Sequence, residues 1–325
     1  MITSSNIIKL PYTNDLTEGG IAYALRSLTY SFDRTGSQPY EKLRRTVANT
    51  AVEIAFRRYL SQQDIPFEVQ AATPFTDSER YDVSLNGQRC EVKSYLISHR
   101  EQMTDMRRNP EIILNAPALV PSDHHAREGH KRDDLYIFAF LAGLIAASQE
   151  DLKKAVTAGQ PHYLVHVMPE EWRKPQHWNP LGTLTLKSDS DEELLVEVNG
   201  QDAAREAMRK VVSLPPKTKV TVDDSFYSVT AIHVRRLPDA RIGIHCDAIK
   251  ETEVVAPLQW GNLWVYGMDI FLAGYLPYEE FGQRAKPLPI NSRTFQYEHT
   301  KVKNLYVPVS NLKPLQNLFN IHQSS

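Results

Sequence analysis

The stretch "RYDVSLNGQRCEVKSYLI", residues 80–97, predicts a two-stranded β-hairpin. Apolar and polar residues alternate on both sides of Asn86 and Gly87. An Asn-Gly pair between two alternating runs is the strongest short-range hairpin signal, because a type I′ turn needs positive φ at both central residues. With this pair as the loop, Val83 faces Cys90, and the apolar residues of both strands share the side that faces the core.

The opposite side of the predicted hairpin places two acidic residues next to each other. The register puts Asp82 opposite Glu91, and Lys93 follows on the same side of its strand. Like charges that face each other in this way destabilise a sheet by about 0.2–1 kcal/mol. A divalent cation offsets the repulsion, since Mg²⁺ is typically held by one or two carboxylates with water and phosphate oxygens. The pattern indicates a metal site beside a lysine; a solvated polar face is the alternative interpretation.

The sequence around the hairpin predicts alternating helices and strands, as in an α/β layer arrangement. "EKLRRTVANTAVEIAFRRYL" has helical periodicity, and a later segment begins at a serine cap with acidic residues in its first turn. We predict helices over 41–60, 148–159 and, in short form, 100–108, and strands over 65–70, 134–141 and 162–169.

Beyond residue 170 the sequence predicts a second domain that is rich in strands. The segment "EEWRKPQHWNPLG", residues 170–182, has the composition of a domain boundary, and several alternating runs follow it. One helix is predicted among them, over residues 201–212. We therefore expect two domains, at residues 1–170 and 171–325, the second of β-rich α+β class.

The motif formed by Asp82 and the Glu91-Val92-Lys93 tripeptide resembles the PD-(D/E)XK nuclease superfamily. The resemblance covers about residues 40–170 and includes the preceding helix and the later strand-helix-strand order. It implies a restriction-endonuclease-like fold, which is a mixed sheet in αβββ-β-α-β order flanked by helices. One departure is the residue before the aspartate, which is tyrosine here and commonly proline in the family.

The resemblance also assigns roles to four residues. Asp82 and Glu91 would bind Mg²⁺, for which Mn²⁺ could substitute. Lys93 would orient the attacking water and stabilise charge on the phosphate. Glu53, on the helix before the sheet, occupies the place of the family's auxiliary acid.

These roles imply a Mg²⁺-dependent endonuclease that hydrolyses the phosphodiester bonds of DNA. Restriction or defence against foreign DNA is the setting that the resemblance favours. Recognition would then fall to the second domain, and double-strand cleavage would suggest a homodimer or a protein partner. Three alternatives remain open: a nuclease of repair, recombination or RNA processing, a non-catalytic DNA-binding subunit, and a protein-interaction module.

Residues 98–130 contain the segment "SDHHAREGH", which places His124, His125 and His130 near an aspartate. A zinc site is conceivable there, because histidine is a frequent zinc ligand. The spacing fits no familiar structural zinc pattern and no cysteine is near, so we favour a loop that overhangs the sheet and contacts phosphates. A plain solvated loop is the alternative. The basic residues that would contact phosphates are Arg100, Arg107, Arg108, Arg127, Lys131 and Arg132.

The composition of the chain is that of an ordinary globular protein. Its 325 residues are 42% hydrophobic and 23% charged, with a formal net charge of −2, so any contact with nucleic acid must come from local patches. Two cysteines suggest a reducing compartment without a disulfide framework. The longest apolar run, 135–148, is shorter than the roughly 20 residues that span a bilayer, and no signal peptide is seen. We therefore expect a cytoplasmic protein without a membrane anchor.

Overall fold

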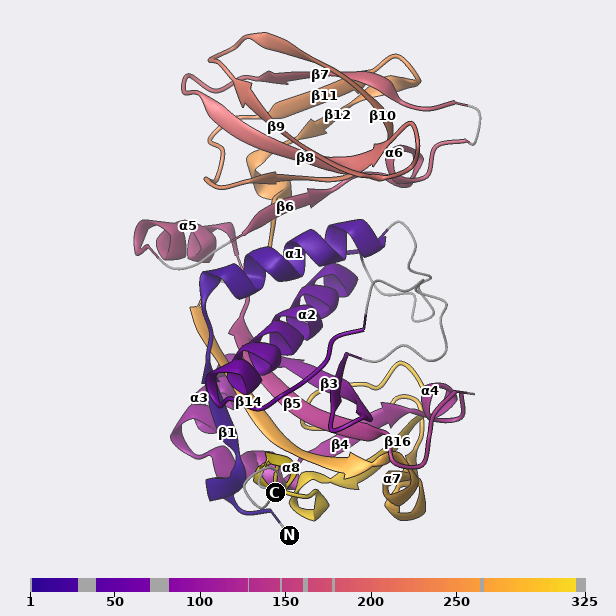
Figure 1. Cartoon of the computed structure of the whole chain (residues 1–325). Helices are drawn as coiled ribbons and strands as arrows, with labels where there is room; N and C mark the ends of the chain where they lie inside the picture. The colour runs from indigo at the N-terminus through magenta and orange to yellow at the C-terminus, as the bar shows by residue number, and fades with distance from the viewer. Residues whose placement is uncertain are drawn as a thin grey trace.

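Three β-sheets and the helices around them form the part of the chain that the structure describes (Figure 1). The computed structural model describes residues 2–28, 39–70, 82–127, 129–146, 148–159, 163–176, 179–263 and 266–319. The fold is mixed α/β, as expected. Within the described ranges, no helix is both long and apolar enough to cross a membrane.

The five-stranded sheet that contains the hairpin combines strands from both halves of the chain. Its order is β1 (Ile8–Pro11), β14 (Tyr266–Pro277), β5 (Leu135–Leu144), β3 (Gln88–Ile97) and β2 (Val83–Leu85). β3 and β5 are parallel, and the other neighbours are antiparallel. Every residue of β5 is buried, which agrees with its continuous apolar sequence. Since β14 comes from beyond residue 170, the sheet does not follow the division that we expected there.

The hairpin has the predicted register. Val83 pairs with Cys90, and the turn residues Asn86 and Gly87 have φ angles of 54° and 78°. Both paired residues are buried, as is Val92 farther along β3. This confirms the predicted turn and the side of the hairpin that faces the core; residues 80 and 81 lie outside the described ranges.

Replacing Gly87 by alanine should lower the free energy of unfolding by about 1 kcal/mol, because an L side chain is strained at positive φ. A Cβ atom at this position would have no other atom within 4 Å, so steric overlap adds nothing to the cost. Urea unfolding measures the change. The control is Gly243→Ala in β11 (Ile242–Cys246), where the glycine is not at positive φ and a Cβ would make an ordinary 3.5 Å contact. Equal stability of the two variants would contradict the assigned turn.

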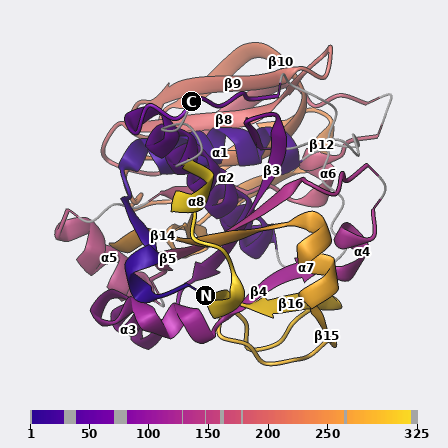
Figure 2. The same cartoon turned by 60° about the horizontal axis from the view of Figure 1, so that its bottom comes forward.

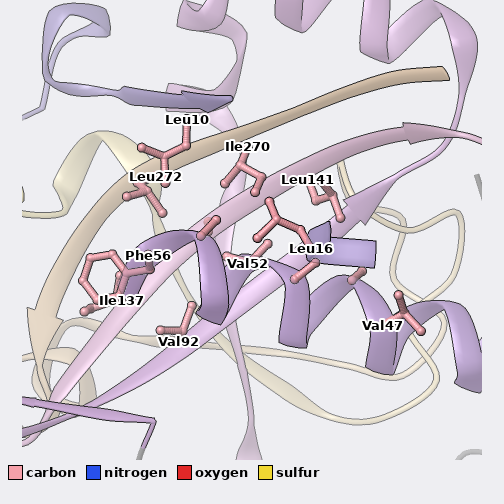
Figure 3. Close-up of a cluster of buried hydrophobic side chains, with 14 of the residues drawn as sticks. Leu10, Leu16, Val47, Val52, Phe56, Val92, Ile137, Leu141, Ile270 and Leu272 are labelled. Atoms are coloured by element: carbon pink, nitrogen blue, oxygen red, sulfur yellow. The ribbon is translucent and has the colours of Figure 1, made fainter. Parts of the chain in front are cut away.

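Helices α1 (Asn14–Leu28) and α2 (Pro39–Gln62) pack on one face of the five-stranded sheet. α2 confirms the helix predicted over 41–60. In Figure 3, Val52 and Phe56 of α2 lie over the strands, near Ile137 of β5 and Val92 of β3. The apolar side of the hairpin therefore faces α2.

The other face of the sheet is covered by segments from both halves of the chain (Figure 2). They are α3 (Arg100–Arg108), the 3₁₀ turn Pro110–Asn115, β4 (Pro117–Pro121), α4 (Ser122–His125), α7 (Tyr278–Arg284), β15 (Lys286–Leu288) and β16 (Asn304–Pro308). β15, β16 and β4 form a three-stranded sheet. Tyr95 and Ile97 are buried beneath this layer, on the same side of β3 as Glu91 and Lys93. The acidic side of the hairpin is therefore not a simple solvated face.

The eight-stranded sheet contains most of the predicted second domain and lies at the top of Figure 1. Its strands are β6 (Leu164–Val167), β7 (Gly182–Ser188), β8 (Leu194–Asp202), β9 (Ala207–Leu214), β10 (Lys219–Val234), β11 (Ile242–Cys246), β12 (Ile249–Val255) and β13 (Gly261–Asn262). Short elements near or between the sheets are α5 (Gln149–Thr157), α6 (Glu170–Arg173), α8 (Gln316–Phe319) and the 3₁₀ turns Ser4–Asn6, Pro257–Gln259 and Val309–Asn311. The β-rich prediction is confirmed.

Three predicted elements differ from the structure. The helix expected over 201–212 is wrong, because β8 ends there and β9 pairs back onto it after a turn with positive φ at Arg205. The strand expected over 65–70 is reduced to a single bridge between Glu68 and Ser84. The strand expected over 162–169 exists as β6, but it pairs with β10 and β13 and so leaves the expected αβββ-β-α-β order incomplete.

Candidate functional site

The site lies where β2 begins, beside β3. Pairing between the two strands stops at Val83 and Cys90, whereas β3 continues along β5 as far as Ile97. The backbone N–H of Asp82 donates to the carbonyl of Cys90 at 3.0 Å. Its carboxylate Oδ2 accepts the N–H of Val92 at 2.7 Å. In a longer β2, a backbone carbonyl would accept the N–H of Val92; here the Asp82 side chain accepts it instead. This hydrogen bond holds the Asp82 carboxylate against the edge of β3.

Glu91 and Lys93 share one side of β3 and contact each other. The ammonium of Lys93 donates to the Glu91 carboxylate and lies 2.9 Å from Nε2 of His124. The same ring nitrogen lies 2.8 Å from the Glu91 carboxylate. Lys93 also sits 5.4 Å from the centre of the Tyr136 ring, within cation–π range. The side chains of Glu91 and Lys93 are only 22% and 13% exposed.

The two carboxylates differ in their electrostatic environment. Burial raises the pKa of Asp82; the hydrogen bond from Val92 opposes this, and the negative charge of Glu91 adds to it. Burial also disfavours the charged form of Glu91, but the Lys93 ammonium and His124 hold the pKa of this carboxyl well below its ordinary value. The positive groups therefore favour the ionised form of Glu91, whereas burial and the charge of Glu91 oppose the ionisation of Asp82.

The side chains at this point fit a divalent cation. Carboxylate oxygens are the ligands that Mg²⁺ prefers, and Asp82 carries a charge penalty that a cation would relieve. The N–H of Val92 binds Oδ2 of Asp82, and no residue within the described ranges donates a hydrogen bond to Oδ1. Asp82 and Glu91 are the residues that would hold the ion.

Glu53 reaches the site through an arginine. Its carboxylate lies 3.9 Å from the guanidinium of Arg57, which donates at 2.8 Å to the backbone carbonyl of Asp82. Glu53 belongs to α2, on the face of the sheet opposite Glu91. The role of auxiliary acid stays a prediction, and the structure places an arginine between this acid and Asp82.

The histidine segment contributes two rings to the site. One oxygen of Glu91 and one ring nitrogen each of His124 and His130 lie within 4.8 Å of one another. His124 comes from α4, and the His130 ring packs edge-on against it at 5.6 Å. The sequence predicts a phosphate-contacting loop here, and nothing in it links this loop to Glu91. Local sequence offered only a weak signal, which is a pair of histidines between two buried strands.

The loop that carries His130 is attached to β3 by a buried ion pair. Arg89 donates to both oxygens of Asp134, at 2.9 and 2.6 Å, and the two side chains are only 11% and 10% exposed. The backbone N–H of Lys131 donates to the same carboxylate at 2.7 Å. From the other side, the His130 ring stacks on Tyr278 of α7 at 4.7 Å. The loop is thus held from both halves of the chain.

The predicted phosphate-contacting residues fall into two groups. One group lies on α3, after the end of β3, and the other lies in the loop around His130. Arg107 pairs with Asp269 at 2.6 Å, and Arg132 with Glu279 at 3.6 Å. All of them are exposed, so their role in binding nucleic acid stays a prediction: Arg100, Arg107, Arg108, Arg127, Lys131 and Arg132.

Comparisons with known protein families, curated proteins and solved structures find no match to this chain.

Proposed function

We propose that this protein is a Mg²⁺-dependent DNA endonuclease whose active site contains Asp82, Glu91 and Lys93. The observation that carries the proposal is the arrangement at the start of β2. The Asp82 carboxylate accepts the N–H of Val92, and Glu91 and Lys93, on either side of Val92, contact each other; all three residues are partly buried. A mixed sheet with a parallel β3–β5 pair, an adjoining hairpin and helices on one face supports a restriction-endonuclease-like arrangement. Restriction or defence is the setting we favour, by analogy with that arrangement.

Each residue of the proposed active site would have a separate role in phosphodiester hydrolysis. A divalent cation bound by Asp82 and Glu91 would act as a Lewis acid on the phosphate and lower the pKa of water. Lys93, released from Glu91, would donate to a phosphate oxygen and stabilise the charge that develops there. Tyr136 would keep the lysine side chain directed toward this position, because the ammonium already lies over its ring.

The test is incubation of the full chain with supercoiled plasmid in Mg²⁺, in Mn²⁺ and in EDTA. We expect nicked or linear products with either ion and none with EDTA. Parallel incubations with single-stranded DNA, branched DNA, RNA and base-modified DNA separate a defence nuclease from the repair and RNA-processing alternatives. Intact substrates in every incubation that contains metal would reject the proposal.

Replacing Asp82 by asparagine should maintain or raise stability in the absence of metal while abolishing the response to Mg²⁺. Asparagine keeps an oxygen for the N–H of Val92 and removes the charge that Glu91 repels, a gain of about 0.2–1 kcal/mol at neutral pH. Because the folded-state pKa of Asp82 is raised above 3.8, wild type loses stability as pH rises from 3.8 through the folded-state pKa. The gain of the variant should therefore shrink as the pH falls toward 4.

Thermal unfolding with and without Mg²⁺ measures both effects. Wild type should gain stability from the ion, because the ion binds the folded state preferentially, and the variant should show little of that gain. Asp247→Asn is the control, since that carboxylate is fully exposed. A destabilised Asp82 variant with an undiminished response to Mg²⁺ would show that this residue is structural.

A further inference from the structure

We propose that Glu91, His124 and His130 form a site for a divalent transition metal, represented by Zn²⁺. The donor set is one carboxylate and two imidazoles, and it differs from the Asp82–Glu91 pair that the proposed nuclease would use. The three donor atoms lie within 4.8 Å of one another, although they come from β3, α4 and the loop before β5. Two histidines and one glutamate form a known zinc donor set that leaves a coordination position open.

The clearest sign of a missing ligand is the ring of His130. Its Nε2 atom is buried and has no hydrogen-bond partner among the described residues. The other ring nitrogen, Nδ1, lies 3.8 Å from the carboxylate of Asp134. A metal-binding histidine commonly turns its second nitrogen toward a carboxylate in this way, which leaves the first nitrogen directed at the metal. A buried imidazole with one open nitrogen beside Glu91 and His124 is what such a site requires.

The ammonium of Lys93 occupies the place of a cation in this group. It contacts the Glu91 carboxylate and lies 2.9 Å from Nε2 of His124. Two of the three donors therefore already face a positive charge. A metal ion in the place of the ammonium would bind these two acceptors and also His130. Lys93 and the metal ion therefore compete for one position.

The support around the site lowers the cost of binding. Arg89 and Asp134 hold the loop, and Tyr278 stacks on the ring of His130, so this side chain need not be ordered when the ion arrives. The donor atoms also select the type of ion. Imidazole suits zinc and other transition metals, whereas Mg²⁺ prefers oxygen ligands and retains several waters.

The test uses the full chain, stripped of metal, without any nucleic acid. Calorimetric titration with Zn²⁺ should show one equivalent bound, and Co²⁺ should give the visible absorption of a histidine-ligated ion of low coordination number. His124→Gln and His130→Gln should each weaken Zn²⁺ binding on the order of a hundredfold. Lys93→Met should strengthen it by about tenfold, because the competing ammonium is gone.

The matched control is His166→Gln. His166 also lies against a glutamate, with Nε2 3.0 Å from Glu253, and its other ring nitrogen is buried without a partner among the described residues. Within the same ranges, it belongs to no group of three metal donors. This variant should bind Zn²⁺ like wild type.

Three outcomes would overturn the inference: no Zn²⁺ bound by wild type, unchanged affinity in both natively folded histidine variants, or equal weakening in His166→Gln. If the histidine variants do not fold, the affinity of Lys93→Met for Zn²⁺ is the test. Unchanged or weaker Zn²⁺ binding by this variant would also reject the site. The inference does not rest on the proposed nuclease activity. A chain that binds Zn²⁺ and cleaves nothing would reject only the nuclease, and one that cleaves without binding Zn²⁺ would reject only this site.

Discussion

Replacing Lys93 by alanine should reduce Mg²⁺-dependent cleavage of plasmid DNA by about 10²–10³-fold, the usual effect of removing one donor to a developing oxyanion. Lys93 is the only lysine or arginine that the structure shows in contact with Glu91 among the described residues. The loss should appear in the maximal rate, because the charge on the phosphate develops in the transition state. Initial rates of nicking at saturating DNA measure the change.

The matched control for this prediction is Lys154→Ala. Lys154 also pairs with a glutamate, Glu150, but it lies exposed on α5. This variant should cleave at the rate of wild type. Near wild-type cleavage by the Lys93 variant would remove the basis of the proposed active site, whereas an equal loss in both variants would indicate a general effect of lysine removal.

Replacing Arg89 by methionine should destabilise the protein by about 3–5 kcal/mol, because it leaves the carboxylate of Asp134 buried without its partner. The side chains of both residues are about one-tenth exposed, and Arg89 supplies two of the hydrogen bonds to this carboxylate. The loop with His130 should loosen at the same time, since Arg89 also donates to the carbonyl of Gly129. Urea unfolding measures the stability, and hydrogen exchange of the loop measures its order.

The control for the ion pair is Arg58→Met. Arg58 pairs with Asp15 at the surface, where both side chains are more than one-third exposed. Breaking an exposed pair should cost about 0.2–1 kcal/mol. A similar small cost for Arg89→Met would show that Asp134 is stabilised by other groups, and that the loop is held without the ion pair.

Local sequence was sufficient for the hairpin, the long helix and the central strand. Asn86 and Gly87 define the turn by their backbone preferences, and the turn defines which residues face each other. The periodicity of 41–60 and the apolar run of 134–141 likewise lie within single elements, α2 and β5. These features depend on neighbours in the chain, which the sequence displays directly.

The sequence does not show which distant segments of the chain pair with each other. The residues of 201–212 have helical preferences, yet the pairing of β9 with β8 and the burial of Val212 and Leu214 override them. β14 joins the first sheet beside β5, and β6 joins the other, because each finds its partners far away in the chain. Which distant strands pair depends on how much apolar surface the whole folded chain buries.

The candidate site also combines features that local sequence predicts with contacts that only the folded chain creates. Strand parity alone placed Glu91 and Lys93 on one side of β3, since successive side chains of a strand point to opposite faces. Only the tertiary structure shows that this side is covered and that His124 and His130 meet Glu91 there. Their position depends on Arg89 and on Tyr278, which lies far along the chain, and no local pattern encodes a contact over that separation.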